Sequence, residues 1–202
     1  MDSAPVKTIL SRPVYGTLSP QAGKSHLLIA DAEGASAILD LAKKAPEDFF
    51  ANAHIMFIPG RTGDSFQASL KALKPAQYYE GPTVAAALPR LNWTLANAHM
   101  GLRMYLAGTE GLIGQMMQAA IEAGIEPASI QTEHRGSWAR RVQCVHCKGI
   151  TENVTTQPVT CSHCGLLLLV RDHYSKRHAA FQGVCINAED PTEIPQTEEI
   201  FR

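Results

Sequence analysis

The chain has 202 residues, of which 45% are apolar and 18% charged, and its formal net charge is −1. This composition supports an ordinary hydrophobic core and excludes global disorder. The near-zero charge argues against electrostatic capture of the whole protein by nucleic acid or an anionic membrane. Residues 1–10 lack an apolar signal-peptide core, and the apolar run at 166–170 is too short to span a bilayer. We therefore expect a cytoplasmic protein with no membrane partner.

The first part of the chain predicts an extended arm followed by an α/β domain. Residues 1–25 are rich in proline and glycine, and residues 26–137 alternate between short apolar runs and helical patterns. Strands alternating with helices indicate a parallel sheet with flanking helices. The expected strands are 26–30, 54–58, 77–80, 103–107 and 129–133; the expected helices are 34–45, 65–73 and 111–124, with a short helical turn at 83–88.

The pattern changes after Gly136. Residues 138–187 show no helical period but contain two cysteine pairs and two apolar stretches, 166–170 and 181–186, which predict a small β-rich module. Residues 188–202 carry five acidic residues against one basic residue and predict a flexible acidic tail.

Four cysteines predict one metal site. Cys144 and Cys147 form the first C-x-x-C pair, and after thirteen residues Cys161 and Cys164 form the second. Two residues between ligands allow one tight turn to aim both thiolates at a single ion, and four thiolates complete a closed tetrahedral site. The spacing is typical of a zinc ribbon, so we predict structural Zn²⁺ in preference to mononuclear iron.

Three further side chains near this motif have simpler interpretations. His146 and His163 lie inside the pairs, but four sulfurs already fill the coordination sphere, so both are expected to be exposed or hydrogen-bonded. Cys185, between two apolar residues, is expected to be an inert thiol.

Several stretches of residues 26–133 resemble the nucleotide-binding half of the ferredoxin reductase family. Residues 30–37 (ADAEGASA) stand where that family has A-G-G-x-G-x-T-P, residues 58–61 (IPGR) match its Y-G-x-R, and residues 104–111 (MYLAGTEG) match its V-Y-x-C-G-P-x-G. The resemblance implies NADPH contacts from the matching positions, which are Gly34, Ser36, Gly60, Arg61, Gly108 and Thr109.

The first loop departs from that family in a way that affects function. Asp31 and Ala32 replace two glycines, and Asp31 and Glu33 place negative charge where a helix N-terminus should attract phosphate. The arm has no room for the family's flavin-binding barrel. Two alternatives follow: the domain binds NADPH weakly, or it has lost cofactor binding, and the acidic loop favours the loss.

The combination of such a domain with a four-cysteine ribbon resembles the small subunits of bacterial dimethylamine monooxygenases. Residues 168–175 (LLVRDHYS) and 183–185 (GVC) also carry this resemblance. It implies a subunit of an NADPH- and O₂-dependent enzyme that demethylates dimethylamine to methylamine and formaldehyde. Reductase and oxygenase subunits would be its partners and would carry the redox cofactors, such as flavin or iron–sulfur clusters. We expect this chain to be structural or regulatory and not catalytic alone.

Two other functions remain open at this stage. One is an NADPH-binding electron-transfer component that donates to a partner's flavin. The other is a nucleic-acid-binding zinc ribbon, suggested by seven basic residues: Arg135, Arg140, Arg141, Lys148, Arg171, Lys176 and Arg177. The few aromatic residues of the ribbon and the acidic tail disfavour nucleic acid.

Overall fold

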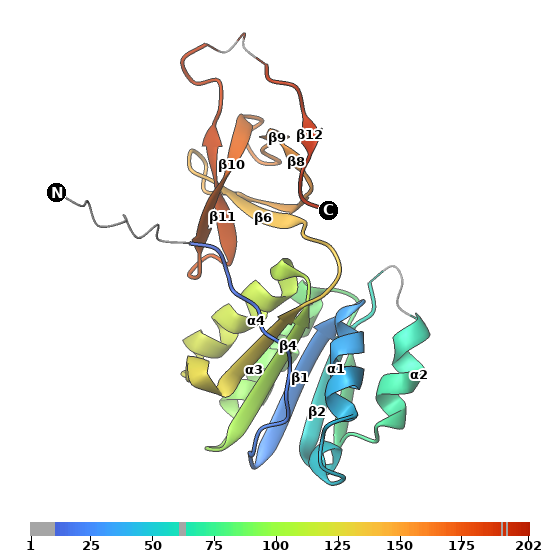
Figure 1. Ribbon diagram of the computed structural model, residues 1–202. Helices are drawn as coiled ribbons and strands as arrows, with labels where there is room; N and C mark the ends of the chain where they lie inside the picture. The colour runs from blue at the N-terminus through green and yellow to red at the C-terminus, as the bar shows by residue number, and fades with distance from the viewer. Residues whose placement is uncertain (1–10, 61–63, 191, 193) are drawn as a thin grey trace, which may run out of the picture.

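A computed structural model describes residues 11–60, 64–190, 192 and 194–202. Figure 1 shows two stacked units: an α/β unit built on β1 to β5 and, above it, a β-rich unit formed by the last third of the chain. In the part of the chain that is described, none of the helices is long and apolar enough to cross a membrane.

The α/β unit is a five-stranded parallel sheet in the order β3-β2-β1-β4-β5. This confirms the predicted parallel sheet. The central strand β1 and its neighbour β2 are buried along nearly their whole length, which explains their continuous apolar runs. The strands are β1 (Ser25–Asp31), β2 (Ala53–Ile58), β3 (Gln77–Glu80), β4 (Leu102–Gly108) and β5 (Ile130–His134).

Helices cover both faces of this sheet (Figure 1). Alternate strand residues separate the two cores: Leu28 and Ile55 pack with α1 and α2, whereas Leu27 and Met56 pack with α3 and α4. The helices are α1 (Gly34–Ala42), α2 (Asp64–Ala72), α3 (Val84–Ala96) and α4 (Glu110–Glu122), and two short 3₁₀ helices are η1 (Phe49–Asn52) and η2 (Pro127–Ser129).

The predicted short turn at 83–88 is wrong, because α3 continues to Ala96. Thr83 begins the helix by accepting a hydrogen bond from the Ala86 nitrogen at 3.1 Å. Pro89 lies inside the helix, where a proline removes one backbone hydrogen bond. Burial of Leu91 and Leu95 against the sheet offsets that loss, since tertiary packing supplies most helix stability in proteins.

The second unit contains a five-stranded sheet in the order β7-β6-β11-β10-β9, antiparallel except between β6 and β11. Val142, Leu168 and Phe181 lie in its core, together with two of the paired cysteines. This confirms the predicted β-rich module. The strands are β6 (Arg140–Cys144), β7 (Ile150–Val154), β9 (Val159–Thr160), β10 (Leu167–Ser175) and β11 (Ala180–Cys185); β8 (Thr156–Gln157) pairs separately with β12 (Glu198–Glu199).

The end of the predicted flexible tail is attached to this unit, so that prediction is wrong for residues 198–202. The β12 strand pairs with β8, and the ring of Phe201 is 8% exposed in the ribbon core. The backbone nitrogen of Trp138 also donates to the Arg202 carbonyl at 2.6 Å. One buried aromatic side chain and a short pairing are enough to hold an otherwise polar segment.

The described part of the N-terminal arm contacts both units. Its Gly16 nitrogen donates to the Thr132 carbonyl at 2.9 Å, and Leu18 is buried in the core of the α/β unit. Arg12 forms an ion pair with Asp172 on β10. The arm thus ties the two units together, while the division of the chain at residues 137 and 187 stays a prediction.

Candidate metal centre

The four predicted cysteines converge in the second unit. The Sγ atoms of Cys144, Cys147, Cys161 and Cys164 all lie within 4.8 Å of one another. Cys144 and Cys164 are 3.8 Å apart at sulfur, and Cys147 and Cys161 are 3.7 Å apart. A tetrahedral zinc ion with Zn–S bonds of about 2.3 Å requires sulfur separations of about 3.8 Å. The group therefore fits a four-thiolate metal ion.

Two matching turns present these thiolates. In the first turn, the backbone nitrogen of Lys148 donates to the Cys144 carbonyl at 2.9 Å. In the second turn, the backbone nitrogen of Gly165 donates to the Cys161 carbonyl at 3.0 Å. Lys148 (φ +64°) and Gly165 (φ +77°) occupy the same left-handed position in the two turns. Each C-x-x-C pair is thus followed by a residue that reverses the chain toward the next strand.

Side chains around the cysteines join the two turns. The hydroxyl of Thr151 on β7 accepts a hydrogen bond from the Ser162 nitrogen at 3.1 Å. His163 is exposed, and its Nε2 lies 3.0 Å from the Ile150 carbonyl. Neither His146, which is exposed, nor Cys185 belongs to the group of potential ligands found among the described residues. This agrees with a closed site of four sulfurs.

The carboxyl ends of β1 and β4 form the crevice where a parallel sheet of this order binds dinucleotides. Gly34 lies so close to β4 that a Cβ atom there would stand 2.2 Å from the Ala107 carbonyl oxygen. At Gly108 a Cβ atom would stand 1.7 Å from Oδ1 of Asp31. The two glycines therefore allow the protein to pack against itself at this point.

Asp31 ends β1 and lies against the start of α4. Its carboxylate accepts hydrogen bonds from the Thr109 nitrogen at 3.0 Å and the Thr109 hydroxyl at 2.6 Å. Burial raises the pKa of Asp31, and these hydrogen bonds partly oppose the shift. The sequence indicated only that Asp31 would repel phosphate. The structure adds that its carboxylate uses the donors at the start of α4.

The other predicted nucleotide contacts are only partly brought together. Gly60 (φ +65°) lies beside Ala32 in the first loop, which places it near Gly34. The Ser36 hydroxyl donates to the Glu33 carbonyl at 2.6 Å and is already engaged within α1. Arg61 lies outside the described residues. Gly34, Gly108 and Thr109 meet, but they do so around a carboxylate of the chain itself.

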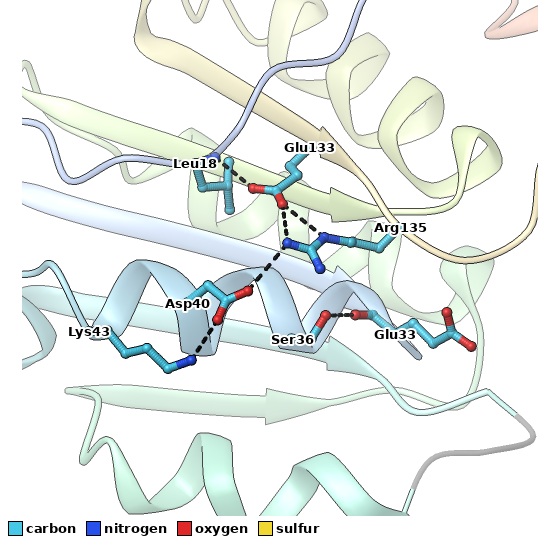
Figure 2. Close-up of polar contacts among 7 residues, drawn as sticks. All are labelled: Leu18, Glu33, Ser36, Asp40, Lys43, Glu133 and Arg135. Carbon is cyan, nitrogen blue, oxygen red and sulfur yellow. Dashed lines mark hydrogen bonds and ion pairs between the residues drawn. The ribbon is translucent and has the colours of Figure 1, made fainter.

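An ion-pair network that the sequence did not reveal lies beside this crevice (Figure 2). The Arg135 guanidinium contacts Glu133 at 2.6 Å and Asp40 of α1 at 3.3 Å. Glu133 also accepts a hydrogen bond from the backbone nitrogen of Leu18 at 2.7 Å. The backbone nitrogen of Arg135 donates to the Gly108 carbonyl at 2.9 Å. The chain leaving β5 is thereby fastened across the carboxyl edge of the sheet.

Comparison with known families assigns both units. The family model "Dimethylamine monooxygenase subunit DmmA-like, N-terminal domain" matches residues 7–130, and the model for the C-terminal domain of the same subunit matches residues 141–184. The chain belongs to this family. This confirms the resemblance found in the sequence.

A curated relative is the "Heme-dependent oxidative N-demethylase delta subunit" of Ectopseudomonas mendocina (strain ymp). It is 36% identical over 110 residues, which are 54% of this chain and 63% of the relative. The match thus leaves more than a third of the relative's length outside the comparison.

Three solved structures show weaker likenesses. A flavohemoglobin from Malassezia yamatoensis matches with a TM-score of 0.38 and 14% identity, over 56% of this chain and 32% of that one. The ferredoxin reductase of a carbazole 1,9a-dioxygenase matches with a TM-score of 0.38 and 13% identity, over 57% of this chain and 34% of that one. A siderophore-interacting protein from Aeromonas hydrophila matches with a TM-score of 0.41 and 15% identity, over 58% of this chain and 53% of that one. Likenesses of this strength assign no ligand. The strand order and register given above establish the α/β architecture.

Proposed function

We propose that this chain is a non-catalytic structural or regulatory subunit of a cytoplasmic NADPH- and O₂-dependent monooxygenase that demethylates dimethylamine to methylamine and formaldehyde. The family description and the name of the relative support a subunit of an N-demethylating assembly. The observation that carries the non-catalytic role is the position of Asp31. Its carboxylate takes the Thr109 donors that a cofactor phosphate would need.

We propose that the four cysteines hold zinc. Bound zinc would cross-link the turns at Cys144 and Cys161, and a closed set of four thiolates leaves no position for substrate. This chain's own contribution is to present the thiolates from two hairpin-like turns and to bury Cys144 and Cys161 in the core of the second unit. The role of such a site is structural.

In this proposal the redox chemistry belongs to partner subunits, a reductase and an oxygenase that carry flavin, iron–sulfur or other redox cofactors. This chain would hold them in a fixed arrangement. Its described surface exposes large apolar side chains on separate elements, including Val14 of the arm (88% exposed) and Met100 before β4 (92%). Exposed side chains of this kind suit contacts with other subunits.

The scaffold role is tested with a pair of cysteine variants. The chain would be co-expressed with its partner subunits, and the complex analysed by native mass spectrometry, metal analysis and dimethylamine-dependent NADPH oxidation. Cys161→Ser should lose zinc and release this chain from the complex, whereas Cys185→Ser, outside the metal group, should retain both. Normal assembly and turnover with Cys161→Ser would contradict the proposal.

Calorimetry separates this role from electron transfer. We expect no saturable heat when the purified chain is titrated with NADPH at millimolar concentration, because the crevice is filled. Binding that weakens when Gly60 or Thr109 is replaced would instead support the alternative of an NADPH-binding component that donates to a partner's flavin.

A further inference from the structure

A cavity lies between the two units at the carboxyl end of the sheet, and Asp31 is not among its lining residues. Its volume is about 520 Å³, and its walls are the arm (residues 12–16), Glu110, His134, Trp138, Arg140 and Phe181. Cavities of this size at the junction of two units, beyond the ends of parallel strands, are where small ligands bind. The function proposed above does not use this cavity.

One wall of the cavity is a stack of flat rings. The imidazole of His134 lies on the indole of Trp138 with centroids 3.6 Å apart and planes 16° apart. The Tyr15 ring is tilted against His134 at 5.5 Å. Trp138 nevertheless remains 50% exposed. Packing on one side and exposure on the other leave a fixed indole surface on which a flat ligand can stack.

The lining also includes an arginine with unused donors. The Arg140 guanidinium lies between the rings of Phe181 and Phe201, 4.0 and 4.1 Å from their centroids, and its side chain is 8% exposed. Its polar contact among the described residues is with Asp172, at 2.9 Å. A guanidinium has five N–H donors, so most of those of Arg140 remain available. The two aromatic rings hold it in one orientation.

Two guanidiniums and two carboxyl groups surround the cavity. Arg12 shares Asp172 with Arg140, so one carboxylate serves two guanidiniums. The second carboxyl group, Glu110, is 7% exposed and accepts a hydrogen bond from the Tyr15 hydroxyl at 3.0 Å. Burial raises the pKa of Glu110, and the hydrogen bond from Tyr15 partly opposes that shift. The N–H donors of the two guanidiniums therefore outnumber the carboxylate oxygens that they contact.

We propose that this cavity binds a planar aromatic anion, whose ring stacks on Trp138 and whose anionic group is held by Arg140 and Arg12. The ring stack favours a flat ligand, and the guanidinium donors that Asp172 leaves unused favour an anionic group on it. This proposal rests on the cavity alone and does not depend on metal in the ribbon.

The two tryptophans of the chain provide a direct test. In full-length Trp93→Phe, Trp138 is the sole indole reporter. Its fluorescence, corrected for absorption by the ligand, would be titrated with AMP, UMP and flavin mononucleotide, which pair rings of different size with one phosphate. At least one should quench it saturably, and the matching nucleoside or riboflavin should bind about ten-fold more weakly, the factor that corresponds to one lost charge-assisted contact.

Two variants make the result specific. Arg12→Gln changes an exposed side chain and should weaken binding of the phosphate ligand by about three- to ten-fold. Trp138→Phe, in which Trp93 alone reports, should show no ligand-dependent change. The proposal is overturned if none of the three phosphates quenches Trp138, if the uncharged counterparts bind equally well, or if dimethylammonium binds in their place.

Discussion

The carboxylate of Asp31, the last residue of β1, accepts two hydrogen bonds from Thr109, the residue that precedes α4. The two residues are 78 positions apart in the chain. They meet at the point where the strand order reverses, which in dinucleotide-binding sheets is the position of the pyrophosphate. In this protein the carboxylate of Asp31, at the end of β1, accepts the hydrogen bonds that the start of α4 would offer to a phosphate.

Replacing Thr109 should test the strength of this contact. Thr109→Val removes a donor to a buried carboxylate and also the cap that accepts from the Leu112 nitrogen. The expected loss in the free energy of unfolding is about 2 to 4 kcal/mol, from a cap of about 1 and an unsatisfied acceptor of about 1 to 3. Thr83→Val, which removes only the cap of α3, should cost about 1 kcal/mol in the same urea titration. Equal losses in the two variants would contradict the role given to Asp31.

The network in Figure 2 yields a second prediction. Arg135→Met leaves Glu133, a buried carboxylate, with the Leu18 nitrogen as its remaining described partner. We expect a loss of about 1 to 3 kcal/mol in urea unfolding, because a buried charged acceptor loses its ion pair. Lys43→Met removes the exposed partner of the same Asp40 and should change stability by less than about 0.5 kcal/mol. A neutral Arg135→Met would show that the network does not stabilise the fold.

A buried histidine predicts a pH dependence of stability. Burial, with a smaller contribution from Arg90, lowers the pKa of His54 from 6.5 to about 4. Between those values the unfolded chain binds a proton that the folded chain does not, so stability should fall as the pH drops from 6.5 to 4. The full shift corresponds to about 3 kcal/mol.

The measurement compares urea unfolding at pH 7.5 and 4.5. His54→Leu should lose less stability between the two conditions than the wild type does, whereas His99→Gln, an exposed site, should behave like the wild type. The comparison of variants removes the effects of acid that all three proteins share. Parallel losses in all three proteins would rule out His54 as the source.

The two matching turns of the metal centre make a prediction about backbone strain. Gly165→Ala places a side chain at φ +77° and should destabilise the second unit by about 1 to 2 kcal/mol, although no atom blocks the added methyl group. Lys148→Gly, at φ +64°, relieves strain but increases the freedom of the unfolded chain, so its net effect should be within about 0.5 kcal/mol of zero. Competition with a chromophoric zinc chelator during urea titration reports both, and a neutral Gly165→Ala would refute the strain argument.

The convergence of the four cysteines was predictable from sequence because its determinants are local. Each C-x-x-C pair sets the direction of two thiolates within one turn, and any hairpin that joins the pairs brings them together. The parallel sheet was predictable for a similar reason: after an initial histidine, the runs at 26–30 and 54–58 are apolar, as expected for strands buried on both faces.

Other features depended on contacts between distant parts of the chain. The local sequence around Asp31 indicates repulsion of phosphate, yet its carboxylate pairs with Thr109. The polar tail indicates flexibility, yet Phe201 is buried in the core of the second unit. Pro89 indicates a helix end, yet α3 continues past it. The sequence by itself determined which four cysteines converge and that the first unit is a parallel sheet flanked by helices. Only the tertiary structure decided what fills the nucleotide crevice and what holds the tail, because burial and hydrogen bonding across long separations outweigh local preference.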